Sequence, residues 1–371
     1  MRIAFIVHEY CKTRGHARYV IELAARFARE HEVHVFAAVI QGERDPRIQF
    51  HYVPSLRFTK LTAVLTFILP ATWRSLASFD IVHAQGLCGL RQNVITSHSC
   101  HAAWFKAQEQ HMGGLTVAQK VVRALMKPLE KYVFQAKHSA AVIAVSKHAK
   151  ADIAHYYDRI EDVSIVYHGV NLAVFHPDNR LRWRAIVRLE LGIGNDKFVA
   201  LYIGDLQKGG IPAIEAIARV DGARLVCISE SNPEPYRLFA EKMDAGDRVH
   251  FLPKSESIER YYSAADVFVM PSFYDTFGMV VSEAMASGLP AIVSVDTGAS
   301  ELIEHGVSGV LIEPAWNVNA VVEWIEQLRD DVGLRENMSI EARKKMEHFT
   351  WDDTAIETMR VYKDVVARKK T

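Results

Sequence analysis

The sequence contains few cysteines and no long apolar run. Its four cysteines lie far apart in 371 residues and form no C-x-x-C pair, which argues against a disulfide scaffold or a cysteine zinc site and favours a reducing cytoplasm. No apolar stretch approaches the roughly 18 residues that a membrane-spanning helix needs. The N-terminus runs directly into a strand pattern without the features of a signal peptide. We therefore expect a soluble, cytoplasmic protein, and at this length two domains.

The chain has no excess of charge of either sign, since 44 Lys and Arg residues balance 44 Asp and Glu residues. The distribution along the chain is uneven, however. Residues 1–180 carry 22 basic and 14 acidic residues, whereas residues 181–371 carry 22 and 30. A basic N-terminal half indicates an anionic partner: nucleic acid, phospholipid or a phosphorylated ligand. Nucleic acid is disfavoured because the basic residues are scattered and no known nucleic-acid-binding module is recognisable.

Short apolar runs alternate with helical patterns along the whole chain. Strands that are apolar on both faces and separated by helices indicate parallel sheets covered on both sides. In the first half the patterns predict strands at 2–7, 33–39, 48–53, 80–84, 93–97, 140–145 and 163–167, with helices at 17–29, 115–137 and 147–157. In the second half they predict strands at 198–203, 224–228, 249–252, 267–270, 291–295 and 309–312, with helices at 210–219, 234–243, 256–264, 279–287, 299–304, 317–329, 334–347 and 352–368.

Two such sets predict an α/β protein with two doubly wound domains. The polar stretch at 171–196 is the expected linker between them. Ligands of open α/β sheets bind beyond the carboxyl ends of the strands, so we expect the site in a cleft between the domains. No G-x-G-x-x-G follows strand 2–7 or strand 198–203, which disfavours a nucleotide-cofactor oxidoreductase.

The segment 271–290, P-S-F-Y-D-T-F-G-M-V-V-S-E-A-M-A-S-G-L-P, carries the strongest functional signal. After a strand comes a loop with Asp275 and Gly278, and then a helix that contains Glu283. A glycine directly before a helix lets the backbone approach a ligand, and the helix N-terminus suits a phosphate or diphosphate. The Glu283 carboxylate suits ribose hydroxyls. Taken alone, however, the two acids fit better as a helix-capping residue and a solvated residue.

This segment resembles the acid-x7-acid motif of the retaining glycosyltransferases of family 4, which have the GT-B fold. The family motif continues as Phe-Gly and Glu-Ala-x-Ala-x-Gly-x-Pro, and the chain has Phe277-Gly278, Glu283-Ala-Met-Ala286, Gly288 and Pro290. Further blocks resemble the family in the same order: A-V-I-A-V-S at 141–146, H-G-V-N-L-A-V-F-H-P at 168–177, and the stretches 298–303 and 306–314.

The resemblance covers nearly the full length and implies two Rossmann-like domains that face each other across a cleft. The implied ranges are 1–178 for an acceptor-binding domain, 190–350 for a domain that binds a nucleotide sugar, and 351–371 for a helix that returns to the first domain. The implied activity is transfer of a sugar from a nucleotide-diphosphate sugar, with UDP favoured over GDP. The resemblance to bacterial envelope glycosyltransferases points to the polysaccharides of the cell envelope.

The resemblance assigns roles to residues of the second domain. Glu283 would hold the ribose of the donor and Asp275 a hydroxyl of the donor sugar. Lys208, in the G-D-L-Q-K-G-G loop that starts at Gly204, would neutralise the diphosphate, where negative charge accumulates as the nucleotide leaves. Lys254, in the loop after strand 249–252, would contact the base. The backbone N–H groups that would face the sugar and the diphosphate are those of Phe277, Gly278 and Met279.

In the first domain, Gly15 would bring the backbone close to the diphosphate, because it precedes helix 17–29. His98, in V-I-T-S-H-S-C-H, would lie near the reacting sugar, and His101 is a second candidate. A lone histidine is more often a structural residue, but the position of His98 after the carboxyl end of a strand makes the functional interpretation equally good. No Asp-x-Asp triplet occurs, so we expect no metal ion and no other cofactor. Retention would follow a front-face route in which the leaving phosphate takes the acceptor proton.

Three departures from the family pattern leave the activity open. Arg14 replaces the first glycine of the family's Gly-Gly loop, Asp205 stands in place of an arginine, and Asp275 replaces the usual glutamate. The sequence is therefore compatible with two functions. One is an active retaining glycosyltransferase, and the other is a degenerate GT-B protein that binds a nucleotide or a partner without turnover.

Two stretches of the first half suggest where an acceptor could lie. Residues 56–76 are very apolar and edged by Arg57, Lys60 and Arg74, and residues 115–137 place five lysine or arginine side chains among apolar ones. Such basic amphipathic surfaces are typical of peripheral contact with the inner face of a membrane. Core-packed helices with solvated charges are an equally good interpretation. The favoured acceptor is an anionic lipid-linked or lipopolysaccharide-type glycan.

Overall fold

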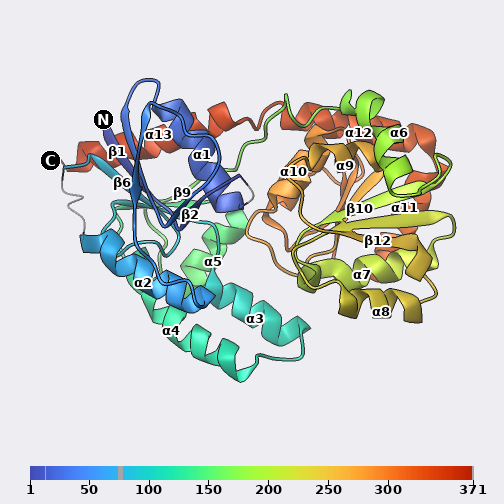
Figure 1. Cartoon of the computed structure of the whole chain (residues 1–371), viewed down its shortest axis with the longest axis horizontal. Helices are drawn as coiled ribbons and strands as arrows, with labels where there is room; N and C mark the ends of the chain where they lie inside the picture. Colours follow the sequence, from blue (N-terminus) through green and yellow to red (C-terminus); the bar gives the residue numbers. More distant parts are fainter. Residues whose placement is uncertain (13, 74–77, 370–371) are drawn as a thin grey trace. The chain divides into compact units, whose positions relative to one another are not determined.

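The computed structural model describes residues 1–12, 14–73 and 78–369, and the chain divides into two compact units. Unit 1 comprises Met1–His168 together with the chain from Trp351 onward, and unit 2 comprises Gly169–Thr350. Figure 1 shows that each unit has its own sheet with helices on both sides. The boundary after His168 falls earlier in the chain than the expected domain end at 178.

Unit 1 is built around a parallel sheet whose described strands follow the order β5-β3-β1-β6-β7-β8-β9. The order reverses between β1 and β6, so the connections leave to opposite sides at that point. The inner strands are buried on both faces, as in other sheets between two helical layers. The strands span Arg2–Ile6 (β1), Glu32–Ala37 (β3), Ile48–Tyr52 (β5), Ile81–Gln85 (β6), Val94–Ser97 (β7), Ala141–Ala144 (β8) and Val163–Ile165 (β9).

Helices and one small extra sheet surround these strands. Strands β2 (Glu9–Tyr10) and β4 (Val39–Ile40) pair with each other just beyond the carboxyl ends of β1 and β3. Neither strand was predicted from the sequence. The helices of unit 1 span Gly15–Phe27 (α1), Lys60–Trp73 (α2), His101–His111 (α3), Val117–Phe134 (α4), Lys147–Tyr157 (α5) and Trp351–Arg368 (α13).

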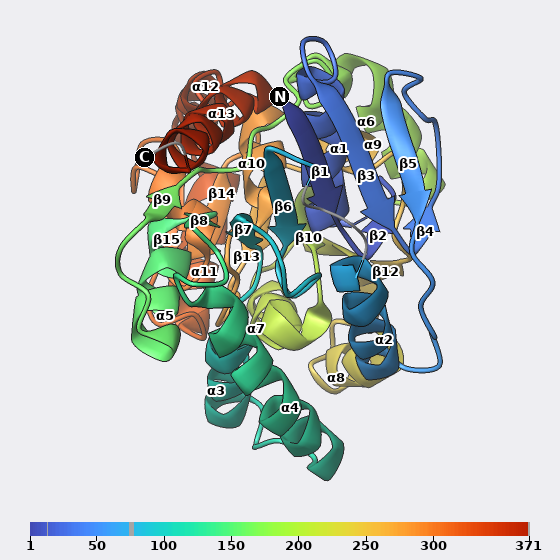
Figure 2. The same ribbon diagram turned by 90° about the vertical axis from the view of Figure 1, so that its left-hand side faces the viewer.

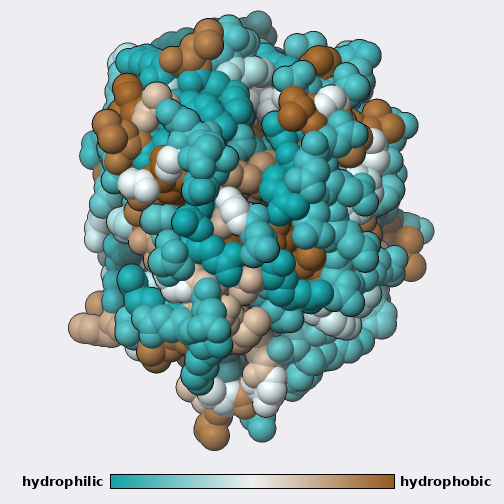
Figure 3. Space-filling view, turned by 90° about the vertical axis from the view of Figure 1, so that its right-hand side faces the viewer, coloured by the Kyte–Doolittle hydropathy of each residue, from teal (hydrophilic) through white to brown (hydrophobic). Residues whose placement is uncertain are grey.

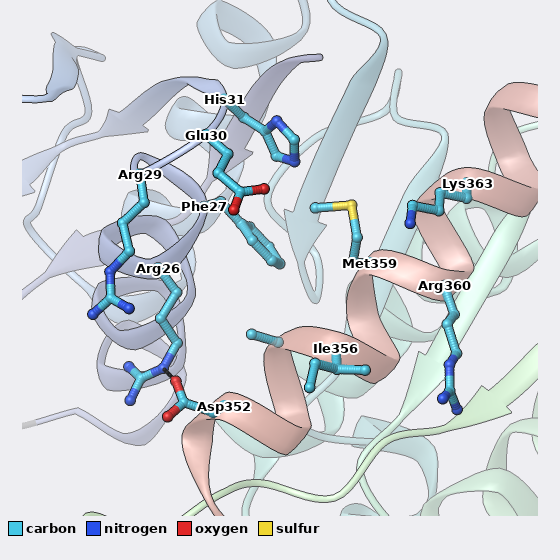
Figure 4. A pocket seen from close by; sticks show the side chains of 11 residues that line it. Arg26, Phe27, Arg29, Glu30, His31, Asp352, Ile356, Met359, Arg360 and Lys363 are labelled. Atoms are coloured by element: carbon cyan, nitrogen blue, oxygen red, sulfur yellow. Dashed lines mark hydrogen bonds and ion pairs between the residues drawn. The ribbon is translucent and has the colours of Figure 1, made fainter.

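The last helix, α13, packs beside α1 (Figure 4). The Arg26 guanidinium of α1 donates to Asp352 over 2.6 Å, and the rings of Phe27 and Tyr362 lie 5.6 Å apart. A cavity of about 440 Å³ opens between the two helices, with Phe27, Ile356 and Met359 among its lining residues. Unit 1 is thus completed by a segment that follows all of unit 2 in the sequence.

Helices α3 and α4 extend away from the sheet of unit 1 in two perpendicular views (Figures 1 and 2). Thr116 and Gln119 form a capping box at the start of α4, which fixes where this helix begins. Among the described residues we find no helix with the length and hydropathy of a membrane span. Arg74 and its neighbours, part of the apolar stretch noted above, lie outside the described residues.

Unit 2 contains a second parallel sheet, with described strands in the order β12-β11-β10-β13-β14-β15. Its reversal point lies between β10 and β13. The strands span Phe198–Ile203 (β10), Ala223–Ile228 (β11), Val249–Leu252 (β12), Val267–Met270 (β13), Ala291–Ser294 (β14) and Val310–Ile312 (β15). The helices span Asn179–Glu190 (α6), Leu206–Arg219 (α7), Glu234–Lys242 (α8), Glu259–Ala264 (α9), Met279–Ala286 (α10), Val318–Asp330 (α11) and Val332–Met346 (α12), with 3-10 turns at Gly246–Arg248 and Gly298–Leu302.

The prediction of a linker at 171–196 is wrong. This stretch contains helix α6, which packs on α9 within unit 2. The inward side of α6 includes two arginines one turn apart next to the buried Val187, and Arg184 and Arg188 donate to the buried carboxylate of Asp266, each over 2.7 Å. Burial alone would raise the pKa of Asp266, but the two guanidinium charges outweigh it and hold this pKa below its usual value. A search for apolar periodicity does not detect a helix that packs partly through arginines.

The predicted fold class and strands agree with the structure. Every predicted strand is present with its bounds shifted by at most a few residues, and both sheets are parallel. On the side seen in Figure 3, apolar residues form scattered patches among hydrophilic ones, as expected for helices that turn their apolar faces inward.

Candidate active site

The carboxyl edge of the unit 2 sheet brings together two of the predicted catalytic residues. Lys208 follows β10 and Asp275 follows β13, and these two strands flank the reversal point of the sheet. The Nζ atom of Lys208 donates to Oδ2 of Asp275 over 2.8 Å, and the two side chains are 23% and 21% exposed. Because ligands of open α/β sheets bind at the reversal point, this ion pair marks the candidate site of unit 2.

Helix α7 holds Lys208 in its first turn, where the helix dipole disfavours a cation. The side chain of Asp205 caps this helix: its Oδ1 accepts hydrogen bonds from the N–H of Gln207 (3.0 Å) and the hydroxyl of Ser231 (2.8 Å). The acid that stands where the family resemblance has an arginine is therefore a helix cap. Gly204, a predicted ligand residue, directly precedes this cap and has φ +149°.

Close packing of α7 against the loop after β13 depends on Gly209, which sequence reasoning did not single out. A Cβ at this position would lie only 2.8 Å from the carbonyl oxygen of Pro271. Beside it, the N–H of Phe273 donates to the carbonyl of Lys208 over 3.1 Å. The K-G-G run at 208–210 was the available signal, since a glycine inside a helix usually has a packing reason.

The loop that carries Asp275 is fixed by the loop after β14. The N–H of Asp275 donates to the carbonyl of Asp296 (3.1 Å), and the N–H of Gly298 donates back to the carbonyl of Asp275 (2.9 Å). Gly278 has φ +84°, and a Cβ there would lie 2.9 Å from Cγ2 of Thr297. This turn therefore requires glycine.

Helix α10 begins directly after Gly278, with Met279 as its first residue. The first N–H groups of a helix have no intrahelical partner, so those at this end are suited to an anion. The N–H of Phe277, another group predicted to face the donor, donates to Oδ1 of Asp275 over 3.2 Å. A side-chain acceptor two residues upstream satisfies it within the loop.

Glu283 is buried in α10, only 5% exposed, and its Oε2 accepts a hydrogen bond from the Tyr262 hydroxyl over 3.0 Å. It is thus not the solvated residue that its sequence position alone suggested. Tyr262 lies in α9 and is itself buried. The sequence gives no sign of this tyrosine, because the contact joins two separate helices, α9 and α10, and therefore leaves no recognisable spacing.

Lys254 lines a cavity of about 600 Å³ at the carboxyl ends of β11 and β12. Its ammonium group donates to Glu230 over 3.2 Å. Leu206, at the start of α7, lines the same cavity and lies two residues before Lys208. The cavity is therefore adjacent to the Lys208 loop, and it is large enough for a planar ring system.

Two predicted residues, Gly15 and His98, belong to unit 1. Gly15 is the first residue of α1, beyond the end of β1. His98 follows β7, and its Nε2 lies 2.8 Å from Oε1 of Gln85 at the end of β6. The ring centroid of His98 lies 5.0 Å from that of Tyr19 and 5.2 Å from that of His168. Burial and, to a lesser degree, the neighbouring imidazoles of His168 and His16 lower the pKa of His98 well below its ordinary value, so it is neutral at physiological pH.

His101, the second histidine candidate, has a different environment. It is the first residue of α3, and its Nδ1 lies 2.5 Å from Oε1 of Glu130, a buried residue of α4. Oε2 of Glu130 accepts hydrogen bonds from the His101 N–H and from the hydroxyl of Tyr157. Burial lowers the pKa of His101, but the Glu130 charge and hydrogen bond outweigh it and raise this pKa above the ordinary value.

Among the described residues, no group of three or more His, Cys, Asp or Glu side chains is arranged to hold a metal ion.

Comparison with known sequences supports the resemblance noted from the motifs. Residues 13–174 match the sequence model of Glycosyltransferase Family 4, and residues 184–345 match that of Glycosyl transferases group 1. A glycosyltransferase of Methanocaldococcus jannaschii with no assigned activity is 29% identical over 77% of this chain and 75% of that protein. The D-inositol 3-phosphate glycosyltransferase of Corynebacterium glutamicum is 32% identical over 62% of this chain, which corresponds to 59% of its own length.

Solved structures agree on the fold. WaaG, a glycosyltransferase involved in lipopolysaccharide biosynthesis, superposes with a TM-score of 0.77 at 21% identity and covers 95% of this chain and 99% of its own. Anabaena HepE in complex with UDP-glucose gives 0.75 at 17% identity, over 98% and 100% of the two chains. The motifs, the two parallel sheets and the matches to both halves agree: the chain belongs to glycosyltransferase family 4 and has the GT-B fold.

Proposed function

We propose that this chain is a retaining, metal-independent glycosyltransferase that transfers a sugar from a UDP-sugar to an anionic acceptor. The observation that carries the proposal is the Lys208–Asp275 pair at the reversal point of the unit 2 sheet. A cation held there by a carboxylate is preorganised for a diphosphate. The cation would then stabilise the charge that develops on the leaving nucleotide without a metal ion.

The carboxylates of the site support a front-face route. A double displacement needs a carboxylate that is available as a nucleophile. Asp275 accepts from Lys208 and Phe277, and Glu283 accepts from the buried Tyr262. These hydrogen bonds support positioning roles for both acids: Asp275 for Lys208 and a hydroxyl of the donor sugar, and Glu283 for the ribose. The leaving phosphate then takes the proton of the attacking hydroxyl.

The donor class is supported by the cavity that Lys254 and Glu230 line next to the Lys208 loop. Its position beside Lys208 matches a nucleoside that extends from the diphosphate along the strand ends. The HepE structure, which contains UDP-glucose, has the same fold. We therefore favour UDP over GDP.

The acceptor proposal rests on charge and on one helix face. Val117, Val121 and Leu125 lie one turn apart along α4 and are 80%, 52% and 44% exposed, and the same helix carries the exposed cations Lys120 and Lys127. Such a face suits contact with an anionic membrane surface. Two similar proteins are described by different acceptors. WaaG is involved in lipopolysaccharide biosynthesis, and the other is a D-inositol 3-phosphate glycosyltransferase, but both acceptors are anionic. We therefore propose a lipid-linked or other anionic glycan acceptor in the cell envelope.

The test is a calorimetric and thermal-shift titration with UDP, GDP, ADP and UDP-glucose, in EDTA and in magnesium. We expect UDP to bind in EDTA and Lys208→Ala to weaken its binding about tenfold, as is typical of a lost charge-assisted contact. Lys197→Ala is the matched control, because Lys197 also forms an ion pair in unit 2, with Asp196 at 2.9 Å, but lies before β10 at the opposite edge of the sheet.

A chain that binds none of these nucleotides would contradict the proposal and support the degenerate GT-B alternative. An equal effect of Lys208→Ala and Lys197→Ala would remove the assigned role of Lys208. Once a donor is known, the anomeric configuration of the product, read by NMR, decides between retention and inversion.

A further inference from the structure

Two arginines of unit 1 meet on one carboxylate just beyond the end of β1. Glu9, in the small strand β2, contacts Nη2 of Arg57 through Oε1 at 2.5 Å and Nε of Arg14 through Oε2 at 3.5 Å. The arginines come from different segments: Arg14 directly precedes α1, and Arg57 lies in the segment before α2. The small β2–β4 sheet, which pairs Glu9 with Val39, fixes the carboxylate that gathers them.

The guanidinium groups of this cluster can be reached from solvent. The side chains of Arg14 and Arg57 are 45% and 53% exposed, whereas that of Glu9 is 23% exposed. Two cations share one carboxylate, so the cluster carries net positive charge. The first turn of α1 adds to it, because it reads Gly-His-Ala-Arg and contains Arg18 but no acid.

We propose that Arg14 and Arg57, held by Glu9, form a phosphate clamp for the acceptor. Guanidinium groups bind phosphate oxygens through parallel N–H bonds and keep their charge at every physiological pH. A carboxylate that already fixes their orientation lowers the entropic cost of that contact. The clamp lies at the carboxyl edge of the unit 1 sheet, where a ligand of this unit is expected. This proposal rests on the proposed glycosyltransferase function and narrows its acceptor to one that carries a phosphate group.

The experiment measures phosphate binding with the donor site already filled. The full chain is saturated with UDP and then titrated by calorimetry with inorganic phosphate, and separately with dihexanoyl phosphatidylglycerol or dihexanoyl phosphatidylcholine below their micelle concentrations. We expect Arg14→Gln and Arg57→Gln to weaken phosphate binding at least fivefold each and to leave UDP affinity within twofold. Arg47→Gln is the control, because Arg47 is also half exposed in unit 1 and paired with one carboxylate, Asp45 at 2.5 Å. The Arg47→Gln variant should bind phosphate as strongly as the parent chain.

The two probe types separate the sources of the phosphate. Binding of inorganic phosphate without phosphatidylglycerol indicates a free phosphorylated acceptor, whereas binding of phosphatidylglycerol but not phosphatidylcholine indicates a lipid headgroup; both support the clamp. Arg14→Gly provides a second variant that restores the glycine of the family pattern, so that loss of binding is separated from a folding defect.

Three results would overturn the clamp. The first is absence of phosphate binding to the UDP-saturated chain, and the second is an Arg47→Gln variant that weakens phosphate binding as much as the clamp variants do. The third is a loss of UDP affinity in the Arg14 variants, which would assign Arg14 to donor binding instead. Failure of UDP itself to bind is a different outcome, since it would refute the proposed function rather than the clamp.

Discussion

The contact between Tyr262 and Glu283 shows what a single hydroxyl can do for a buried carboxylate. A buried acid without hydrogen-bond donors is costly, and the phenol supplies one donor at 3.0 Å. Because Glu283 is only 5% exposed, this hydrogen bond helps to fix the orientation of its carboxylate.

We predict that Glu283→Gln weakens UDP-sugar binding by more than tenfold, because an amide replaces the anionic acceptor that we propose for the ribose hydroxyls. Tyr262→Phe should weaken binding less, by roughly threefold, since it removes only the hydroxyl that orients the acid. Calorimetric titration with UDP and UDP-glucose measures both effects. Equal affinity of the Glu283→Gln variant and the parent chain would show that the ribose is held elsewhere.

Residues in contiguous motifs were predictable, and their partners were not. Asp275, Gly278 and Glu283 were identified because the family motif places them within one short segment. Tyr262 and Gln85 escaped because hydrogen bonds between separate elements leave no spacing in the sequence. The same reason explains why the Lys208–Asp275 bond could not be foreseen, although both residues were singled out.

At the scale of elements, the contact of α7 with the loop after β13 positions Lys208. We predict that Gly209→Ala lowers UDP affinity at least tenfold, because the new methyl group would lie 2.8 Å from the rigid Pro271 carbonyl and push the helix away from Asp275. Gly210→Ala is a matched control in the same helix. The atoms nearest to its methyl group belong to side chains: Cδ2 and Cβ of Leu206 at 3.0 and 3.1 Å, and Cε1 of Tyr236 at 3.4 Å.

The control variant should lose less UDP affinity than Gly209→Ala, because side-chain atoms rather than backbone atoms lie nearest to its methyl group, and it should lose little stability, since alanine is favoured over glycine in a helix by about 1 kcal/mol. Thermal unfolding and UDP titration of the two variants provide the comparison. Similar affinities for both variants would mean that the position of α7 does not control the site.

Element prediction succeeded wherever burial follows a simple period. The strands of both sheets were identified because both faces of each are apolar, and most helices because one face is. Helix α6 was mistaken for a linker because its inner face carries Arg184 and Arg188 against Asp266. The strands β2 and β4 could not be predicted, because a segment of two residues is too short to show an alternation of apolar and polar positions.

At the scale of the molecule, histidines make the stability of unit 1 dependent on pH. Burial lowers the pKa of His83 to about 3 and that of His8 to about 4, from an ordinary value of 6.5. Between pH 6.5 and about 4 the unfolded chain therefore binds protons that the folded chain does not, so stability falls as the pH falls. His101, with its raised pKa, acts in the opposite direction.

We predict that lowering the pH from 7.5 to 5.5 reduces the free energy of unfolding by about 1.4 kcal/mol for each of the two histidines. The hydrogen-exchange protection factors of β1 and β6, which correct for the slower intrinsic exchange at lower pH, should fall more than those of β10 and β13, because His8 and His83 both lie in unit 1. His8→Gln keeps a side-chain donor near the Leu87 carbonyl and should reduce the pH dependence. An unchanged dependence in this variant, or an equal fall of the protection factors in both units, would contradict the assignment.

The return of α13 to unit 1 has a consequence for synthesis on the ribosome. Arg26 meets Asp352, and His83 lies 2.6 Å from the hydroxyl of Tyr362, so each contact waits for α13 to be made. Unit 2 is continuous in the sequence and is translated before α13. Unit 1 therefore begins before unit 2 and is completed after it, and the nascent chain carries an unfinished unit 1 core, with the α13-binding surface of α1 uncovered, until translation reaches α13.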